Sequence, residues 1–329
     1  MNVPRPAPQS GPGTGRRIVI AGATGTVGRL TAARLAATGA HELTLLTRDP
    51  EKAAAQGLPG RLVGAEFASP STLRDGMRGA DTLLLITNDP LHPEHDINLL
   101  AAAAAAGMEH VVKLSAQAVS DPDADDLITR WQRENEQRLK DSGPAWTLLR
   151  PRSFMTHALA WRDGIVERGV VRSVHGDSLN ACVDPSDIAD AAVRALTVDG
   201  PHMRTYALTG PRAISDRDKT AVLADILNQP LAFEEISLDQ ARQQWRGRLP
   251  ECMVDALTAS AERQRSGAKA AVADGVREAT GHAPRPFRTW AAEEASAFTR
   301  PGVQSPAPLT DWTVPPCLLP LLCSKAGPS

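Results

Sequence analysis

Ile18-Val-Ile-Ala21, followed directly by Gly22-Ala-Thr-Gly25-Thr-Val-Gly28, is the stretch that decides the fold. The apolar run predicts a buried strand, and residues 27–38, closed by Gly39, predict a helix. Glycines between a strand and a helix permit a tight turn and a close approach of the backbone to a ligand. The helix N-terminus adds unpaired N–H groups. This stretch therefore predicts the phosphate loop of a dinucleotide-binding Rossmann domain.

Apolar runs alternate with helical patterns along the first half of the chain. We expect strands at 18–21, 43–47, 61–67, 82–87, 110–115 and 146–150. Strands that alternate with helices form a parallel sheet covered on both faces. Asp49-Pro50, Ser69-Pro70 and Asp184-Pro185 each place a side-chain oxygen before a proline and so predict helix starts. The predicted fold class is α/β, a doubly wound parallel Rossmann sheet.

The chain divides into four predicted parts. They are a disordered leader (1–15), a Rossmann NAD(P)-binding core (16–150), a smaller, mainly helical substrate lobe that also contributes to the core (151–300), and a Pro-rich tail (301–329). The leader lacks the apolar run of a signal peptide. Short strands are expected at 170–174 and 206–209. Because the second half offers few strands, we expect it to pack on the carboxyl edge of the first sheet.

The composition of the 329 residues excludes several classes of protein. A hydrophobic fraction of 42% with 22% charged residues is typical of a globular protein. The net charge of -2 does not attract nucleic acid, and no apolar stretch reaches the length of about 20 residues that spans a membrane. Cys182, Cys252, Cys317 and Cys323 lack metal-ligand spacing. We therefore expect no metal site. We expect the cysteines to be small core residues and tail thiols in a reducing cytoplasm. The expected oligomeric state is a monomer or homodimer.

Arg48, which follows the second predicted strand, bears on the choice of cofactor. NAD-preferring enzymes place a carboxylate there, about twenty residues past the glycines. Arg48 can pair with a 2′-phosphate and stack on adenine, or it can simply face solvent. The neighbouring Asp49 is explained as a helix cap. The sequence thus favours NADP(H), with NAD(H) as the alternative.

The order of the motifs resembles the NmrA-like branch of the atypical short-chain dehydrogenase/reductases. The stretches that carry the resemblance are the Gly22–Gly28 loop, Leu45-Leu-Thr-Arg-Asp-Pro-Glu-Lys52, Gly79-Ala-Asp-Thr-Leu-Leu-Leu-Ile-Thr87, Val111-Val-Lys-Leu-Ser115, Trp146-Thr-Leu-Leu-Arg-Pro151 and Val183-Asp-Pro-Ser-Asp-Ile-Ala189. The resemblance extends over residues 17–298. The family contains NAD(P)H quinone reductases, other reductases and regulators that bind the dinucleotide.

The resemblance also implies where a cofactor would lie, at the carboxyl ends of the strands. The implied contacts are Gly22, Thr24, Gly25, Thr26 and Val27 at the pyrophosphate, Arg48 at the adenosine end, Thr87 and Asn88 at the nicotinamide ribose, and Ser115 with residues 151–155, Pro151 and Phe154 among them, at the nicotinamide and substrate. Glu66 departs from the family's pattern, which has Asp at this position, so its contact with adenine is in doubt.

The proton donor of many short-chain reductases, a Tyr with a Lys one helical turn later, has no counterpart here. The single Tyr is Tyr206, beyond the Rossmann core, and Gly210 stands where the Lys would follow. Gln132 lies where relatives often have His. Hydride transfer to a carbonyl still needs a proton or a stabilised oxyanion, so other groups must serve.

Three residues are candidates for the catalytic role. Ser115 either donates a hydrogen bond to the substrate or caps the end of its strand. His157 is either a titratable group of the site or a surface and packing residue. Asn88 could orient a substrate carbonyl.

Three cations near the same edge have two interpretations each. Lys113, on the same face of its strand as Ser115, either reaches the cofactor or extends to the rim. Arg150 and Arg152 either steer an anionic or phenolic substrate or are surface charges.

We expect an NADPH-dependent reductase that transfers hydride to a small-molecule quinone or aromatic ketone, for example one derived from a polyketide. Quinones need little help from a protein acid, so substrate-assisted protonation suits a site without the Tyr. The alternative is a non-catalytic NADP(H)-binding redox sensor. A sugar-nucleotide epimerase is disfavoured, because that chemistry relies on the missing Tyr.

Overall fold

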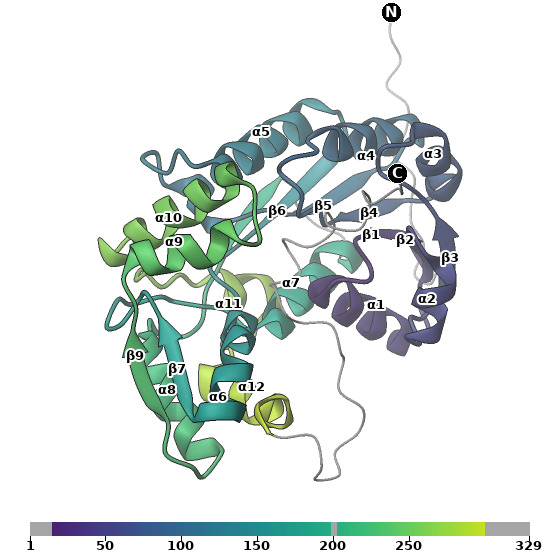
Figure 1. Cartoon of the computed structure of the whole chain (residues 1–329). Coiled ribbons are helices and arrows are strands. Elements are labelled where there is room, and N and C mark those ends of the chain that lie inside the picture. The colour runs from purple at the N-terminus through teal and green to yellow at the C-terminus, as the bar shows by residue number, and fades with distance from the viewer. Residues whose placement is uncertain (1–14, 199–202, 300–329) are drawn as a thin grey trace, which may run out of the picture.

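A computed structural model describes residues 15–198 and 203–299, and a parallel sheet is its central feature (Figure 1). The sheet has seven strands in the order β3-β2-β1-β4-β5-β6-β8, and each neighbouring pair is parallel. Its strands are β1 (Arg17–Ala21), β2 (Glu42–Thr47), β3 (Arg61–Gly64), β4 (Thr82–Leu85), β5 (His110–Leu114), β6 (Ala145–Pro151) and β8 (Arg204–Leu208). The strand order reverses between β1 and β4, so the predicted doubly wound Rossmann fold is confirmed.

Helices cover the sheet and build the rest of the molecule. They are α1 (Thr26–Thr38), α2 (Pro50–Ala55), α3 (Pro70–Met77), α4 (Glu94–Ala105), α5 (Leu127–Asp141), α6 (Arg162–Arg168), α7 (Pro185–Thr197), α8 (Asp216–Ile226), α9 (Leu238–Arg246), α10 (Glu251–Arg265), α11 (Gly275–Thr280) and α12 (Phe287–Glu293), with short 3-10 helices η1 (Gln117–Ser120), η2 (Met155–Trp161) and η3 (Ala295–Phe298).

The three predicted helix starts are confirmed. Asp49 caps α2 by accepting from the Lys52 N–H at 2.9 Å, and Asp184 caps α7 in the same way. Ser69 begins α3 without capping it, because its hydroxyl lies 3.3 Å from the Ser71 hydroxyl.

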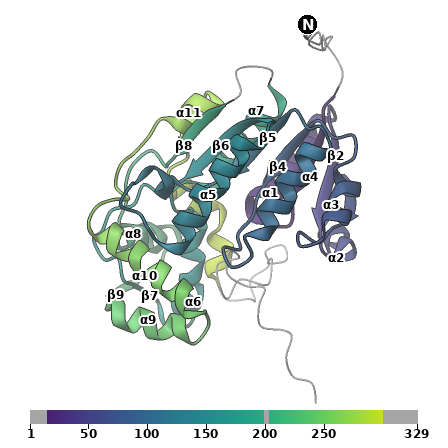
Figure 2. The ribbon, with the colours of Figure 1, turned by 90° about the horizontal axis from the view of Figure 1, so that it is seen from above.

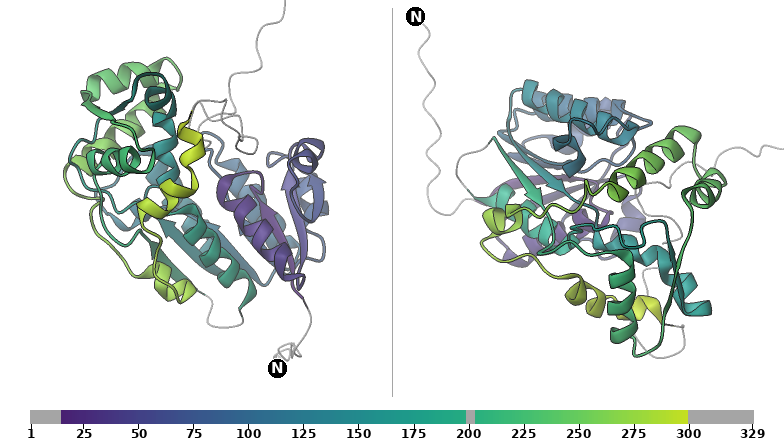
Figure 3. Two further views of the ribbon diagram at one scale, coloured as in Figure 1. Left: turned by 90° about the horizontal axis from the view of Figure 1, so that it is seen from below. Right: turned by 90° about the vertical axis from the view of Figure 1, so that its left-hand side faces the viewer.

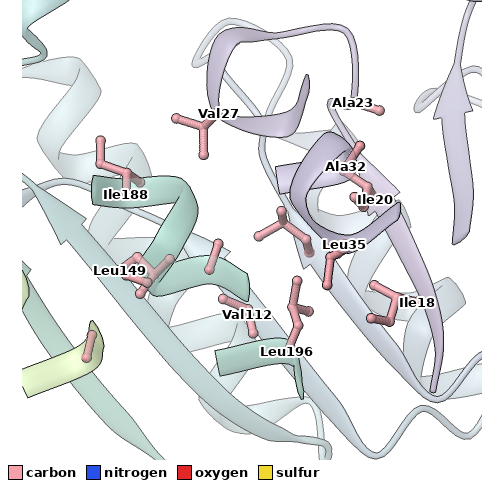
Figure 4. Close-up of a cluster of buried hydrophobic side chains, with 14 of the residues drawn as sticks. Ile18, Ile20, Ala23, Val27, Ala32, Leu35, Val112, Leu149, Ile188 and Leu196 are labelled. Carbon is pink, nitrogen blue, oxygen red and sulfur yellow. The ribbon is translucent and has the colours of Figure 1, made fainter. Parts of the chain in front are cut away.

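The side chains of β1 point alternately to the two faces of the sheet, and each face is covered by its own helices. Ile18 and Ile20 face the side packed by α1 and α7, whereas Val19 and Ala21 face the side packed by α3, α4 and α5. Figure 4 shows the first of these cores, with Ile188 of α7 packed close to β6. Figure 2 shows α4 and α5 lying across the second face, and Figure 3 shows α1 beside α7.

The second half of the chain does more than cover the edge of the sheet. It supplies β8, which pairs with β6 in parallel from Thr147↔Arg204 to Pro151↔Leu208. It also forms a two-stranded parallel sheet from β7 (Val170–Ser173) and β9 (Ala232–Glu235). This small sheet lies with α6, α8 and α12 to one side of the main sheet (Figure 1). The strand predicted at 206–209 thus corresponds to β8, through which this half contributes to the main sheet.

Two strands end earlier than the sequence indicates. β3 ends at Gly64 instead of residue 67, and β4 ends at Leu85 instead of Thr87. After β4, the Ile86 N–H still bonds to the Ala21 carbonyl at 3.1 Å, but the Thr87 side chain turns to α4. Apolar character continues past the end of a strand when the chain remains buried.

The predictions for the two ends of the chain and for the cysteines can be compared with the structure in part. The predicted tail (301–329) and the predicted leader (1–15), except for residue 15, lie outside the described residues, as do Cys317 and Cys323. Cys182 is a buried core residue as predicted, whereas Cys252 is exposed on α10. Within residues 15–198 and 203–299, no helix has the length and apolar character needed to cross a bilayer.

Candidate active site

The loop between β1 and α1 lies where the strand order reverses. Gly22 has φ +86°, and a Cβ there would meet the Ile86 carbonyl oxygen at 2.5 Å. Gly28 packs equally closely, since a Cβ would lie 2.2 Å from the Gly22 carbonyl oxygen. The glycines thus let the loop pass between the segment after β4 and the first turn of α1. In open α/β sheets this crevice is where ligands bind.

The first turn of α1 fits a phosphate. Gly25 is the N-cap in extended conformation, no side chain caps the helix, and the first turn holds no acidic residue. A Cβ at Gly25 would meet only the Gly22 carbonyl, at 3.4 Å. Thr24 is exposed, Thr26 is half-buried and Val27 is buried. The loop offers N–H groups at a helix end, which is the donor set that a pyrophosphate requires.

Arg48 is exposed at the end of β2, next to the Asp49 that caps α2. Among the described residues no carboxylate forms an ion pair with its guanidinium. It is therefore free to meet an anion at the adenosine end of the site. Glu66, two residues beyond β3, is exposed as well.

The ends of β4 and β5 share a buried ion pair. Lys113 of β5 and Asp96 of α4 are both fully buried, with Nζ to Oδ1 at 3.1 Å. The Thr87 hydroxyl donates to the same carboxylate oxygen at 2.8 Å. The expectation that Lys113 extends to the rim is wrong, because Asp96 compensates its charge inside the protein. Asn88, the next residue after Thr87, is exposed.

Ser115, at the end of β5, is held by a residue that sequence reasoning missed. Its hydroxyl donates to the Glu136 carboxylate of α5 at 2.6 Å. Arg150, at the end of β6, donates two hydrogen bonds to the same carboxylate. Glu136 lies on the buried face of α5 with Trp131 and Leu139, and its helical spacing from those core residues was the signal for it.

The segment after β6 carries the aromatic part of the site. Pro151 is buried, Phe154 is half-buried, and the rings of Phe154 and His157 stack with centroids 6.0 Å apart. His157 reaches the surface. The protein around the ring, together with the positive charges of Lys219 and Lys269, lowers the pKa of His157 to about 4. At neutral pH this imidazole carries no positive charge.

Tyr206 lies on β8, the edge strand, where it packs against the core shared by α1 and α7. It is the single Tyr of the sequence, so the site has no Tyr–Lys pair. Asp187, Asp190 and His282 could together approach a metal ion, but Arg285 donates to both carboxylates. That group is an ion-pair cluster that attaches the segment before α12 to α7.

Known proteins that resemble this chain also bind a nicotinamide dinucleotide. A family model described as NAD(P)H-binding matches residues 22–199. The chain belongs to this NAD(P)H-binding family. Its fold and relatives confirm the resemblance to NmrA-like, atypical short-chain reductases and the nicotinamide dinucleotide as cofactor.

Two curated relatives and one solved structure define the likeness. The chain is 49% identical to the (4-alkanoyl-5-oxo-2,5-dihydrofuran-3-yl)methyl phosphate reductase of Streptomyces griseus, over 85% of this chain and 99% of that protein. It is 32% identical to the NAD(P)H azoreductase of Xenophilus azovorans, over 85% and 99%. The NADPH-dependent quinone oxidoreductase 2 of Escherichia coli, complexed with NADPH, superimposes with TM-score 0.74 at 25% identity, over 85% and 98%. The chain is thus an NAD(P)H-dependent oxidoreductase, as predicted.

Proposed function

We propose that this enzyme uses NADPH to reduce a conjugated double bond, and that its substrate class is an acylated butenolide bearing a phosphomethyl group. The single observation that carries the proposal is that the two hydrogen-bond donors at the end of β5, Ser115 and Lys113, already have partners in the protein. The Ser115 hydroxyl already donates to Glu136, and the Lys113 ammonium already donates to Asp96. A site whose nearest donors are engaged suits an acceptor that stabilises its own negative charge.

The chemistry of the acceptor decides between substrate classes. Hydride transfer to an isolated aromatic ketone produces an alkoxide, which needs a proton from the protein. Hydride transfer to a quinone or to an acylated butenolide produces a delocalised phenolate or enolate. The sequence predicts a quinone or an aromatic ketone as substrate. Because Ser115 and Lys113 already donate to carboxylates of the protein, we favour an acceptor whose double bond is conjugated with carbonyl groups.

Identity of 49% with a butenolide phosphate reductase supports the choice within that class. In the substrate that this name describes, the ring double bond is conjugated with the alkanoyl and lactone carbonyls. NADPH would supply a hydride to the double-bond carbon that bears the phosphomethyl group and leave as NADP⁺. The electron pair of the double bond moves into the dicarbonyl system as an enolate, and a proton from water then reaches the carbon between the two carbonyls.

The chain's own residues would bind and orient. The Gly22–Gly28 loop and the first turn of α1 hold the pyrophosphate, and Arg48 pairs with the 2′-phosphate. Thr87, Asn88 and Ser115 lie at the ends of β4 and β5, where the nicotinamide end is expected. Phe154 and His157 offer a stacked pair of rings beside it. Of the three predicted catalytic residues, we assign Asn88 and His157 to substrate orientation and Ser115 to positioning.

The test is NADPH oxidation by the full-length protein with three acceptors. They are the phosphate ester (4-hexanoyl-5-oxo-2,5-dihydrofuran-3-yl)methyl phosphate, a benzoquinone and acetophenone. We expect turnover with the first two and none with acetophenone. NADPH deuterated at the transferred position should place deuterium on the carbon that bears the phosphomethyl group. Faster turnover of acetophenone than of both conjugated acceptors would contradict the proposal.

A further inference from the structure

Lys269 lies within electrostatic reach of three other cations, Arg152, Lys219 and Arg263, and the charges of this group are only partly compensated. Arg263 pairs with Asp126 at 2.7 Å, and Lys219 pairs with Asp216 at 2.9 Å. Arg152 and Lys269 form no such pair with any carboxylate in the part of the chain that the structure describes. Two cations without counter-ions at the edge of a substrate site are unusual, because partial burial of a charge costs free energy.

Arg152 is the residue that follows β6. Its Nε is buried and has no hydrogen-bond partner among residues 15–198 and 203–299. Burial lowers the pKa of Arg152, and the charge of Asp121 acts in the opposite sense. The Asp121 carboxylate itself accepts from the Asp123 N–H at 3.0 Å. The guanidinium therefore retains donors for a ligand.

Lys269, in the loop after α10, has a hydroxyl as its partner: Nζ donates to the Ser260 hydroxyl at 2.8 Å. Burial lowers the pKa of Lys269 to about 8, and the positive charges of Arg263, Arg152 and Lys219 act in the same direction while Asp126 opposes them. A lysine surrounded by other cations is stabilised by an anion.

Backbone hydrogen bonds bring these two residues to one place. The Ala181 N–H bonds to the Lys269 carbonyl at 2.9 Å, and the Val183 N–H bonds to the Ser153 carbonyl at 2.9 Å. The short segment from Ala181 to Val183 therefore links the loop of Lys269 to the residue next to Arg152. The Asn180 side chain adds a bond to the Ser153 hydroxyl at 3.0 Å. The arrangement is built by the fold and does not depend on flexible surface side chains meeting by chance.

We infer that Arg152 and Lys269 bind the phosphate group of the substrate, outside the part of the site that holds NADPH. The inference rests on the proposed function, which places a phosphomethyl group on the substrate. A guanidinium supplies a planar pair of donors to phosphate and an ammonium supplies a compact charge. Because Arg152 follows β6, as Phe154 does, a phosphate held there leaves the attached ring near the aromatic pair. The two cations would thus select phosphorylated over free butenolides.

The experiment measures binding to the full-length protein saturated with NADP⁺, so that phosphate sites of the cofactor are filled and no turnover occurs. The probes are the phosphate ester (4-hexanoyl-5-oxo-2,5-dihydrofuran-3-yl)methyl phosphate and the corresponding alcohol, which lacks the phosphate. Both are titrated by calorimetry. We expect the ester to bind at least about tenfold more tightly than the alcohol, since hydrogen bonds to charged groups are strong. R152Q and K269Q should each weaken binding of the ester about tenfold or more and leave binding of the alcohol unchanged.

Control measurements make a failure informative. Arg288, an exposed cation paired with Asp225 in the same lobe, provides the matched variant R288Q, which should bind the ester as the unmodified protein does. Equal thermal midpoints and equal NADPH affinity show that the variants are folded. Equal binding of ester and alcohol, or full binding of the ester by R152Q and K269Q, would overturn the inference. Absence of NADPH oxidation with every conjugated acceptor would instead reject the proposed function, and the binding result would still decide the phosphate site.

Discussion

The Arg150 guanidinium closes on the Glu136 carboxylate through two hydrogen bonds, Nε to Oε1 at 2.8 Å and Nη2 to Oε2 at 2.5 Å. Arg150 comes from β6 and Glu136 from α5, so the pair joins the sheet to the helix that covers it. The Glu136 side chain is only 2% exposed, and the Ser115 hydroxyl donates to it as well. A carboxylate at this depth needs every one of these donors. Ser115 and Arg150 are therefore fixed in place before a substrate binds.

The first prediction concerns the stability that this pair contributes. Replacing Arg150 by Met leaves a buried carboxylate without its main partner, and we expect a loss of about 3 kcal/mol or more in urea unfolding. Arg172 and Glu234 form a similar two-bond pair, but their side chains are 51% and 48% exposed. R172M should cost less than about 1 kcal/mol. Equal losses in the two variants would show that burial of Glu136 is not what matters.

A second prediction separates positioning from proton donation at Ser115. Because the hydroxyl already donates to Glu136, S115A should lower kcat for a quinone less than about tenfold. Loss of a true general acid would lower it by about 10² to 10⁴. The measurement is steady-state NADPH oxidation, with unchanged NADPH affinity as the folding control. A drop of a thousandfold would restore Ser115 as the proton donor.

Arg48 is predicted to set the cofactor preference. R48Q should raise the Kd for NADPH about tenfold or more, because a charge-assisted contact with the 2′-phosphate is lost. The Kd for NADH, which lacks that phosphate, should change little and provides the internal control. Fluorescence titration of both dinucleotides measures the two values. Equal weakening of NADPH and NADH would contradict the assignment of Arg48 to the 2′-phosphate.

His175 is predicted to make the fold sensitive to mild acid. Burial lowers the pKa of His175 to about 4, with Lys269, Lys219 and Arg265 acting in the same direction and Asp216 opposing them. Between about pH 6.5 and 4 the unfolded chain binds a proton at this ring that the folded chain does not, so stability falls as pH falls through this window. Urea unfolding at pH 7, 6 and 5 measures the slope. H175N should reduce the slope but not abolish it, because the pKa of His157 is lowered in the same way, and an unchanged slope would exclude His175 as a cause.

Particular residues show how far the sequence led towards the site. The glycine loop, Arg48 and the segment after β6 are predicted from local pattern, and the structure places them at the carboxyl ends of strands β1, β2 and β6 of one parallel sheet. The sequence predicts that Lys113 reaches the cofactor or the rim, because no local pattern indicates that Asp96 lies opposite it. Glu136 and Lys269 were missed for the same reason. Glu136 is separated from Arg150 by the turn between α5 and β6, and Lys269 lies over a hundred positions from Arg152.

The sequence by itself determined the cofactor loop, the parallel α/β sheet and the absence of a Tyr–Lys pair, because each depends on neighbouring residues or on composition. The tertiary structure decided which charges are already paired. Asp96 neutralises Lys113, Glu136 holds Ser115 and Arg150, and Arg152 and Lys269 are left without a carboxylate partner in the described residues. Those pairings join helices, strands and loops far apart in the chain. The energy of a charge depends on the partners and the water around it, which only the folded chain sets.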